Sequence, residues 1–429
     1  MMAQANVTTI ARAPTDWSSP AMQGRIRRRY RSERLFKAAG LGAIGISMLF
    51  LALLLANMLL NGASGFRQTE VLVPITLDPG VLMLDRARIT GPEAEQALAA
   101  SNLDGMTAEA ADAAFGKGGA RLVSDGAWLR VRERLLADPA MLGRTASFWL
   151  PAATALDQAA KGKAGSHADP DVQAAYDRLK AAGKVRTSVN LGFLTGADST
   201  DPVLVGIWGA FKGSLITMLV TLIISFPIGV LSALYLEEYA PRNRWTDLIE
   251  VSINNLAAVP SIIFGLLGLA VFLNFMNMPR SAPLVGGLTL ALMTLPVIVI
   301  AGRNAIKAVP PSVRDAALGI GASPVQVVFH HVLPLALPGI LTGTIVGMAR
   351  ALGETAPLLM IGMRAFIAAA PEGVSSPATV LPVQIFLWSD EVSRGFVEKT
   401  SAAIIVLLVF LLGMNGLAIY LRNRFERRW

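Results

Sequence analysis

The sequence predicts an all-α polytopic membrane protein with six transmembrane helices and a small α/β domain inserted after the first of them. Three observations support this prediction. Of the 429 residues, 53% are hydrophobic and only 16% are charged, an apolar excess that soluble domains rarely reach. Six apolar stretches each approach or exceed the roughly 20 residues that cross a bilayer. Residues 62–205, between the first two stretches, have mixed polarity and the patterns of a folded domain.

The composition also limits the chemistry of the chain. There are no cysteines, which excludes disulfides and thiolate metal sites. The three histidines, His167, His330 and His331, are too few and too scattered for a convincing metal cluster. A formal charge of +8 suggests basic flanks beside anionic membrane lipid, not nucleic-acid binding.

Residues 1–37 form a basic N-terminal segment that contains the run Arg25–Arg31. Such a run is also typical of nucleic-acid patches, but an uncharged apolar stretch, Ala38–Leu60, follows at once. This stretch exceeds the roughly 7–15 residues of a signal-peptide core, so residues 38–61 are expected to stay as the first transmembrane helix. The positive-inside rule places the N-terminus in the cytoplasm.

Residues 62–205, called the insert below, are predicted as a small α/β domain outside the cytoplasm, because they follow the first crossing. Strands are expected at Thr69–Leu77, before the turn Asp78-Pro79-Gly80, and at Val185–Leu194. The segment shows no catalytic spacing. Its basic cluster is more typical of a solvated face than of an anion site and consists of Arg130, Arg132 and Arg134. Helical patterns are found at Pro92–Ala100, Ala108–Phe115, Gly126–Ala137 and Pro170–Ala182, the last stopped by Gly183.

Residues 206–429 are predicted as a five-helix membrane core. Six crossings in total return the basic C-terminal tail to the cytoplasm, where the positive-inside rule favours it, and place residues 309–331 on the same side. The sequence contains no G-x-x-x-x-G-K-[ST] phosphate loop, so the chain cannot hydrolyse ATP by that means. The five stretches are Gly209–Tyr235, Leu256–Phe275, Leu284–Ala301, Val332–Leu352 and Ser401–Leu421.

The loop 309–331 is predicted to hold two short helices. Pro310-Pro311 stops the preceding helix, and Ser312 is expected to cap the next one in a capping box with Asp315. That helix should end near Gly321, where the turn needs a positive φ that glycine adopts without penalty. Ser323 is expected to cap the second helix in a box with Gln326, with Pro324 at its first position.

This loop resembles the EAA loop of bacterial ABC importer permeases. Asp315-Ala316-Ala317 is followed by Gly321, His331 and Leu333-Pro334 at the family's spacing, with Asp315 in place of Glu and His331 in place of Ile. The resemblance implies that the loop docks on a separate ATPase, with Asp315, Ala316, Ala317 and Gly321 in the coupling motif. The alternative is a capped surface loop without a partner, in which the Asp315 carboxylate only stabilises its own helix.

A second constellation lies at the far end of the next apolar stretch. Arg350 and Glu354 are spaced to share a helix face, while Gly353 and Pro357 suggest that the helix breaks there. Arginine binds two oxygens of an oxyanion at once, and broken membrane helices commonly form transport sites. A structural salt bridge at the outer interface is an equally good interpretation. Lys212, near the outer end of the second stretch, more often snorkels than attracts anions.

The membrane core is similar to phosphate importer permeases of the PstA type over roughly residues 205–425. The similarity is carried by Ala258–Gly268 (AVPSIIFGLLG) and by Arg350–Leu359 (RALGETAPLL). It implies the type I ABC importer permease fold in the cell inner membrane, and a transporter subunit, not an enzyme. It also implies that Arg350, Glu354 and Thr355 line the substrate pathway.

The same resemblance implies the partners. They are a PstC-like permease subunit in a heterodimer, two ATPase subunits that use ATP and Mg²⁺, and an extracytoplasmic phosphate-binding protein, with a phosphate-sensing kinase complex as a further candidate. No cofactor is expected on this chain. Two other functions stay open: a permease for another oxyanion, and a six-span phosphate-sensing signalling receptor. A free-standing ion channel is disfavoured, because nothing resembles a selectivity filter.

Overall fold

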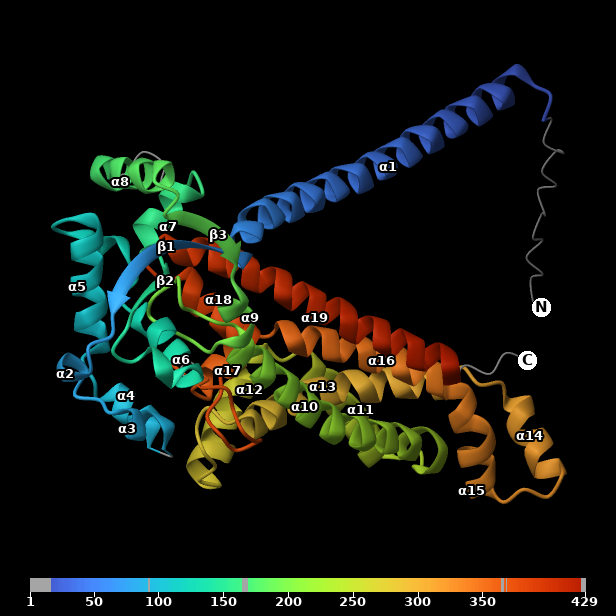
Figure 1. Cartoon of the computed structure of the whole chain (residues 1–429). Coiled ribbons are helices and arrows are strands. Elements are labelled where there is room, and N and C mark those ends of the chain that lie inside the picture. The colour runs from blue at the N-terminus through green and yellow to red at the C-terminus, as the bar shows by residue number, and fades with distance from the viewer. Residues whose placement is uncertain (1–16, 92, 164–168, 364–365, 368, 426–429) are drawn as a thin grey trace, which may run out of the picture. The chain divides into compact units, whose positions relative to one another are not determined.

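The computed structural model describes residues 17–91, 93–163, 169–363, 366–367 and 369–425 (Figure 1). The chain divides into two compact units, residues 1–57 and 58–429. The boundary falls inside helix α1 (Pro20–Ala63), whose 44 residues include both the basic run and the first predicted span. Residues 58–205 therefore belong to the same compact unit as the membrane helices that follow them.

Among the described residues, five helices are long and apolar enough to cross a membrane, or six if one bent pair is counted as a span. The prediction of a helical polytopic protein is thus confirmed. The five begin with α1, and the remainder are α10 (Trp208–Leu234) continued by η5 (Tyr235–Tyr239), α13 (Pro283–Lys307), α15 to α16 (Pro324–Gly353) and α19 (Gly395–Phe425).

The bent pair corrects the third predicted span, Leu256–Phe275, which is not one straight helix. Helix α11 (Arg244–Ala257) ends before Pro260, and α12 (Ser261–Gly268) with η6 (Leu269–Phe275) leaves at 102° to it. Proline lacks an N–H and disfavours helical geometry in the residue before it, so the chain turns at this point. The apolar helix after the turn, α12 with η6, covers residues 261–275, whereas the predicted span began at Leu256.

Small residues allow the central helices to pack closely. A Cβ on Gly287 of α13 would lie 2.5 Å from Val220 of α10, and one on Gly343 of α16 would lie 2.1 Å from the Cβ of Ala301 of α13. Substitution at either glycine would therefore push the helices apart. Such contacts are the usual means of helix association in lipid, where apolar burial alone gives little preference.

The insert contains a three-stranded antiparallel sheet in the order β2-β1-β3 (Figure 1). The central strand β1 (Arg67–Thr76) agrees with the predicted strand, and β2 (Thr145–Pro151) was not foreseen. The prediction for Val185–Leu194 was wrong in its second half. Strand β3 ends at Val189, because the Asn190 side chain accepts a hydrogen bond from the N–H of Phe193 and caps a new helix.

Short helices cover this sheet and share an apolar core with it, centred on Val71, Val73 and Leu150, which are fully buried. Gly183 stops α8 at φ +68°, as predicted. The helices are η1 (Ser64–Phe66), α2 (Pro79–Leu82), α3 (Arg86–Thr90), α4 (Ala94–Ala99), α5 (Leu103–Phe115), η2 (Gly119–Leu122), α6 (Trp128–Ala137), η3 (Pro139–Met141), α7 (Thr154–Ala160), α8 (Pro170–Ala181) and α9 (Leu191–Thr195).

Candidate functional site

The predicted coupling loop folds as α14 (Pro311–Gly319), α15 (Pro324–Gln326) and the π-helix η7 (Val327–Val332), which leads into α16 (Leu333–Gly353). The expected capping box of Ser312 with Asp315 is wrong. Helix α14 begins at Pro311 with Pro310 as its N-cap, so Ser312 already lies inside the first turn and caps nothing. Two consecutive prolines start the helix earlier because their fixed φ suits its first positions.

The turn between the two short helices agrees with the prediction. Gly321 has φ +89°, its N–H bonds the carbonyl of Leu318 at 2.9 Å, and the N–H of Ala322 bonds the carbonyl of Ala317 at 3.1 Å. This pair of bonds is a Schellman motif, which requires a left-handed residue at the position of Gly321. The Ser323 capping box is present: its hydroxyl accepts from the N–H of Gln326 at 3.3 Å, and its own N–H donates to the Gln326 side chain at 2.9 Å.

The three residues of the Asp-Ala-Ala motif have different environments. Ala317 is buried in an apolar cluster with Val327, Val328 and other residues of η7 and the neighbouring helices. Asp315 and Ala316 lie on the exposed side of α14. Ala317 therefore joins the two short helices, whereas Asp315 and Ala316 are accessible to a partner chain.

A charged network that the sequence reasoning missed attaches this loop to the membrane helices. Arg314 donates to Glu238 of η5, with Nη2 2.6 Å from Oε1, and also to the backbone carbonyls of Val309 and Ile306 at 2.8 and 3.1 Å. Beside it, Arg303 of α13 contacts Glu237 of η5 and Glu250 of α11. We call this set the loop anchor: Glu237, Glu238, Glu250, Arg303, Lys307 and Arg314.

At the opposite end of α16, the structure brings Arg350 and Glu354 together. The helix ends at Gly353 and α17 (Ala356–Met360) starts three residues later, so the predicted break is present. Glu354 is extended, and its Oε1 lies 3.4 Å from Nε of Arg350. Since the Arg350 side chain is 51% exposed and makes this one long contact within the described chain, most of its donors can reach a ligand.

Thr355 occupies the N-cap position of α17 beside Glu354, but its hydroxyl caps nothing. Packing explains the neighbouring motif: a Cβ on Gly265 of α12 would lie 2.6 Å from the Cα of Pro357, and one on Gly268 would lie 3.2 Å from Ile361. The two segments that carry the sequence resemblance, AVPSIIFGLLG and RALGETAPLL, therefore lie against each other. Lys212, at the start of α10, is half-buried.

The two candidate sites are separated by the length of α16. Its 21 residues span about 32 Å at 1.5 Å per residue, with the coupling loop before its first residue and Arg350 near its last (Figure 1). One helix thus links both ends. Within the described residues, which exclude His167, no group of histidines and carboxylates could hold a metal ion.

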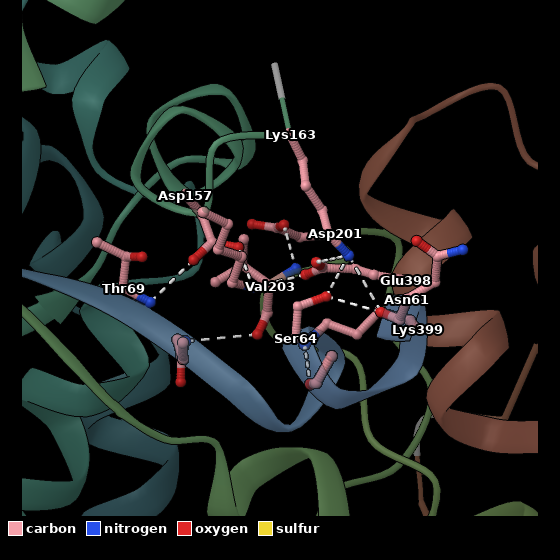
Figure 2. A network of polar contacts seen from close by, with 12 residues as sticks. Asn61, Ser64, Thr69, Asp157, Lys163, Asp201, Val203, Glu398 and Lys399 are labelled. Carbon is pink, nitrogen blue, oxygen red and sulfur yellow. Dashed lines mark hydrogen bonds and ion pairs between the residues drawn. The ribbon is translucent and has the colours of Figure 1, made fainter. Parts of the chain in front are cut away.

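A second charged network, shown in Figure 2, attaches the insert to the membrane helices. The Nζ of Lys161, at the end of α7, lies 2.6 Å from carboxylate oxygens of both Asp157 and Glu398. These three side chains are at most 7% exposed. Glu398 belongs to the first turn of α19, so the contact joins residues that are 237 positions apart.

Two further lysines extend this network. Lys163 donates to the carbonyl of Asn61 at 3.1 Å and to the hydroxyl of Ser64, and Lys399 donates to the carbonyl of Gly65 at 3.0 Å (Figure 2). We call the charged set the insert seam: Asp157, Lys161, Lys163, Glu398 and Lys399. The adjacent charges Glu398-Lys399 just before an apolar stretch were the sequence signal that could have indicated it.

The sequence has clear relatives. Residues 225–428 match a family model described as binding-protein-dependent transport system inner membrane component, and residues 23–169 match one described as a domain of unknown function. The probable ABC transporter permease protein YqgI of Bacillus subtilis is 31% identical over 212 residues, covering 47% of this chain and 71% of that protein. The phosphate transport system permease protein PstA of Haemophilus influenzae is 30% identical over 211 residues, covering 49% and 73%.

Other matches are shorter or more distant. The phosphate transport system permease protein PstA 1 of Mycobacterium tuberculosis is 33% identical over 156 residues. The matched residues are 36% of this chain and 51% of that relative, so the match spans about half of the relative's length. Among solved structures, the MetNI methionine ABC transporter in inward-facing conformations is 16% identical with a TM-score of 0.38, over 52% of this chain and 95% of that chain. Because of its low identity and TM-score, this structural similarity carries no argument here beyond the sequence matches.

Proposed function

We propose that this chain forms half of the pathway of an ATP-driven inorganic phosphate importer. The chain belongs to the family of binding-protein-dependent transport system inner membrane components and is a PstA-type ABC permease. It is a multi-pass inner-membrane subunit, and the ATPase is a separate chain. The observation that carries the proposal is the position of α16, which begins directly after the predicted coupling loop and ends at Gly353, with Arg350 in its last turn.

This geometry supports a division of roles between the two ends of α16. At one end, Asp315 and Ala316 present an exposed helix face to the ATPase, on a loop that Gly321 and Ala317 hold in shape. At the other end, the exposed guanidinium of Arg350 receives the phosphate oxygens, while Glu354 competes for it and Thr355 adds a hydroxyl. Charge-assisted bonds of this kind are about twice as strong as neutral ones, which suits binding of a dianion.

The assembly that we propose follows from the same family. A PstC-like subunit completes the pathway, two ATPase subunits use ATP and Mg²⁺, and an extracytoplasmic phosphate-binding protein delivers the substrate; a phosphate-sensing kinase complex is a further partner. This chain binds no cofactor of its own. In this arrangement both termini and the coupling loop are cytoplasmic, the insert lies outside, and the membrane core has the type I importer permease fold.

The test is ATP-dependent uptake of radiolabelled phosphate into vesicles that contain this chain with its candidate partners. Arsenate should compete, whereas sulfate and molybdate should not. Competition by sulfate or molybdate would favour the permease for another oxyanion, because the Arg350 site alone does not distinguish among such ions. Failure to co-purify with an ATPase would remove the importer and favour the signalling receptor.

The role of Arg350 is tested in the same vesicles. Arg350→Ala should lower uptake about 10–100-fold, since a lost hydrogen bond to a charged group is worth about 1.5–3 kcal/mol, while the complex still assembles. Arg350→Lys should recover little, because lysine cannot bind two oxygens at once. Lys212→Gln is the control and should leave uptake unchanged. Normal uptake by Arg350→Ala would remove this residue from the pathway.

A further inference from the structure

The insert contains a polar cavity of about 410 Å³ that the proposed pathway does not use. Three arginines converge on it from two elements: Arg130 and Arg134 from α6, and Arg186 from β3. Its wall also includes Glu70 of β1 and Trp149 of β2. The sequence reasoning treated Arg130, Arg132 and Arg134 as one solvated face, and the structure separates them. Arg132 stacks 5.6 Å from the ring of Trp128 and does not line the cavity.

Arg186 is held rigidly at the cavity wall. Its position faces Glu70 in the register of β3 and β1, and its Nη2 lies 2.6 Å from Oε2 of Glu70. Its guanidinium carbon lies 4.4 Å from the centre of the Trp149 ring. A cross-strand ion pair on one side and an aromatic face on the other fix the plane of the guanidinium. Since this side chain is still half exposed, donors remain for a ligand.

Arg130 and Arg134 carry two positive charges, which Glu133 of the same cavity wall balances only in part. They are one helical turn apart on α6, and like charges at this spacing repel each other. Arg130 has a loose contact with Glu133, 3.9 Å away and 65% exposed, which contributes little. Arg134 has no ion pair within the described chain. An anion in the cavity would relieve this repulsion.

We propose that this cavity binds an inorganic oxyanion through Arg130, Arg134 and Arg186. The hydroxyl of Ser147, also in the wall, supplies a neutral donor. Two carboxylates, Glu70 and Glu133, also lie in the wall, so the three arginines leave the cavity with a net charge of +1. Planar guanidiniums in a fixed arrangement recognise tetrahedral oxyanions through paired hydrogen bonds. The choice of phosphate among such ions rests on the proposed function; the existence of the site does not.

The experiment is equilibrium binding of radiolabelled inorganic phosphate to the full chain in lipid nanodiscs at low ionic strength. The Arg350→Gln variant is used as the background, so that binding at the proposed pathway is removed. In this background, adding Arg130→Gln and Arg134→Gln together should weaken phosphate binding at least about 10-fold, the loss of one to two charge-assisted bonds. Arg178→Gln, which removes an exposed arginine of α8 outside the cavity, is the matched control and should change nothing.

The outcomes separate this site from the pathway. Displacement of phosphate by sulfate at the cavity would support an oxyanion site of low selectivity. The inference is overturned if the Arg350→Gln chain binds no phosphate, if the double variant binds as well as its background, or if Arg178→Gln weakens binding equally. Phosphate binding at the cavity without ATP-driven uptake would support this site and contradict the proposed importer. ATP-driven uptake without binding at the cavity would support the importer and contradict this site.

Discussion

The insert seam and the loop anchor both attach non-spanning segments to membrane helices through charged side chains, but they differ in burial. In the seam, Asp157, Lys161 and Glu398 are between 3% and 7% exposed. In the anchor, exposed fractions run from 10% for Glu237 to 59% for Lys307. These three side chains of the seam are therefore excluded from water, whereas Lys163 at the edge of the seam is 30% exposed and the anchor is partly accessible to water.

This difference has a mechanical consequence. A buried ion pair is costly to separate, because each partner would be left as an uncompensated charge, whereas a partly solvated pair can exchange its partner for water at lower cost. The insert should therefore stay fixed on the first turn of α19 through the transport cycle. We expect the predicted coupling loop to shift more easily than the insert, because the side chains of Arg314 and Glu238 that hold it are 24% and 12% exposed.

Breaking the seam should have the largest effect on stability. Glu398→Ala leaves Lys161 with one carboxylate and Lys163 with none, so we expect a loss of about 3–5 kcal/mol in the free energy of unfolding, the range for removing one partner of a buried pair. Thermal unfolding of the detergent-solubilised protein measures it. Glu391→Ala, an exposed carboxylate shortly before α19, is the control. A loss no larger than the control's would show that the seam does not hold the insert.

Breaking the anchor should affect coupling more than stability. Arg314→Ala removes bonds to Glu238 and to two backbone carbonyls, with an expected loss of about 1.5–3 kcal/mol that is local to the loop. Phosphate uptake should fall and the loop should become sensitive to protease, while the unfolding temperature changes less than in Glu398→Ala. The exposed Arg242→Ala serves as a control. Wild-type uptake by Arg314→Ala would contradict the anchor's role.

Local and non-local features of these two regions differ in how far the sequence predicts them. The positive φ of Gly321, the Ser323 capping box and the break after Gly353 were all predicted, because each depends on neighbours within a few residues. The charges Glu398-Lys399 before an apolar stretch indicate that a partner is needed, but the sequence does not identify Lys161 as that partner, because the contact joins residues 237 positions apart.

Errors arose where two local rules competed. Ser312 satisfies the pattern of a capping residue, but Pro310 and Pro311 start the helix before it. In β3, hydrophobic residues continue past Val189, but the Asn190 cap starts a helix. In both cases the residue that starts a helix earlier in the chain determined the structure: Pro311 for α14 and Asn190 for α9. The predicted domain boundary at residues 205 and 206 and the roles of Arg350, Glu354 and Thr355 stay predictions for the experiments above.

Two serines of the predicted coupling loop, Ser312 and Ser323, give a smaller and matched test of helix capping. Ser323→Ala removes a hydroxyl that accepts from the N–H of Gln326, so it should cost about 1 kcal/mol in helix stability. Ser312→Ala, eleven residues earlier on the same loop, removes a hydroxyl that caps nothing and should cost much less. Hydrogen exchange of the loop amides measures both. Equal effects would show that Ser312 caps α14 in solution.

The smallest expected effect tests the cost of partly burying a single carboxyl group outside both networks, that of Asp198. Asp198, between α9 and α10, accepts hydrogen bonds from the indole of Trp388 at 3.1 Å and from the N–H of Ser199 at 3.0 Å, both through Oδ1. Burial raises the pKa of this carboxyl above its ordinary value, and the bonds from Trp388, Gln384 and Ser199 only partly oppose the rise. The folded state therefore favours the protonated form.

Stability from this group is fully present below the unfolded pKa and is lost as the pH rises through the higher folded pKa. Asp198→Asn keeps an Oδ1 acceptor for both donors and carries no charge, so it should match the wild type in acid and be slightly more stable at neutral pH. The difference between the two unfolding temperatures, followed from about pH 3 to about pH 7, isolates this group from other titrations. A difference of the opposite sign would mean that the hydrogen bonds stabilise the Asp198 carboxylate by more than its burial destabilises it.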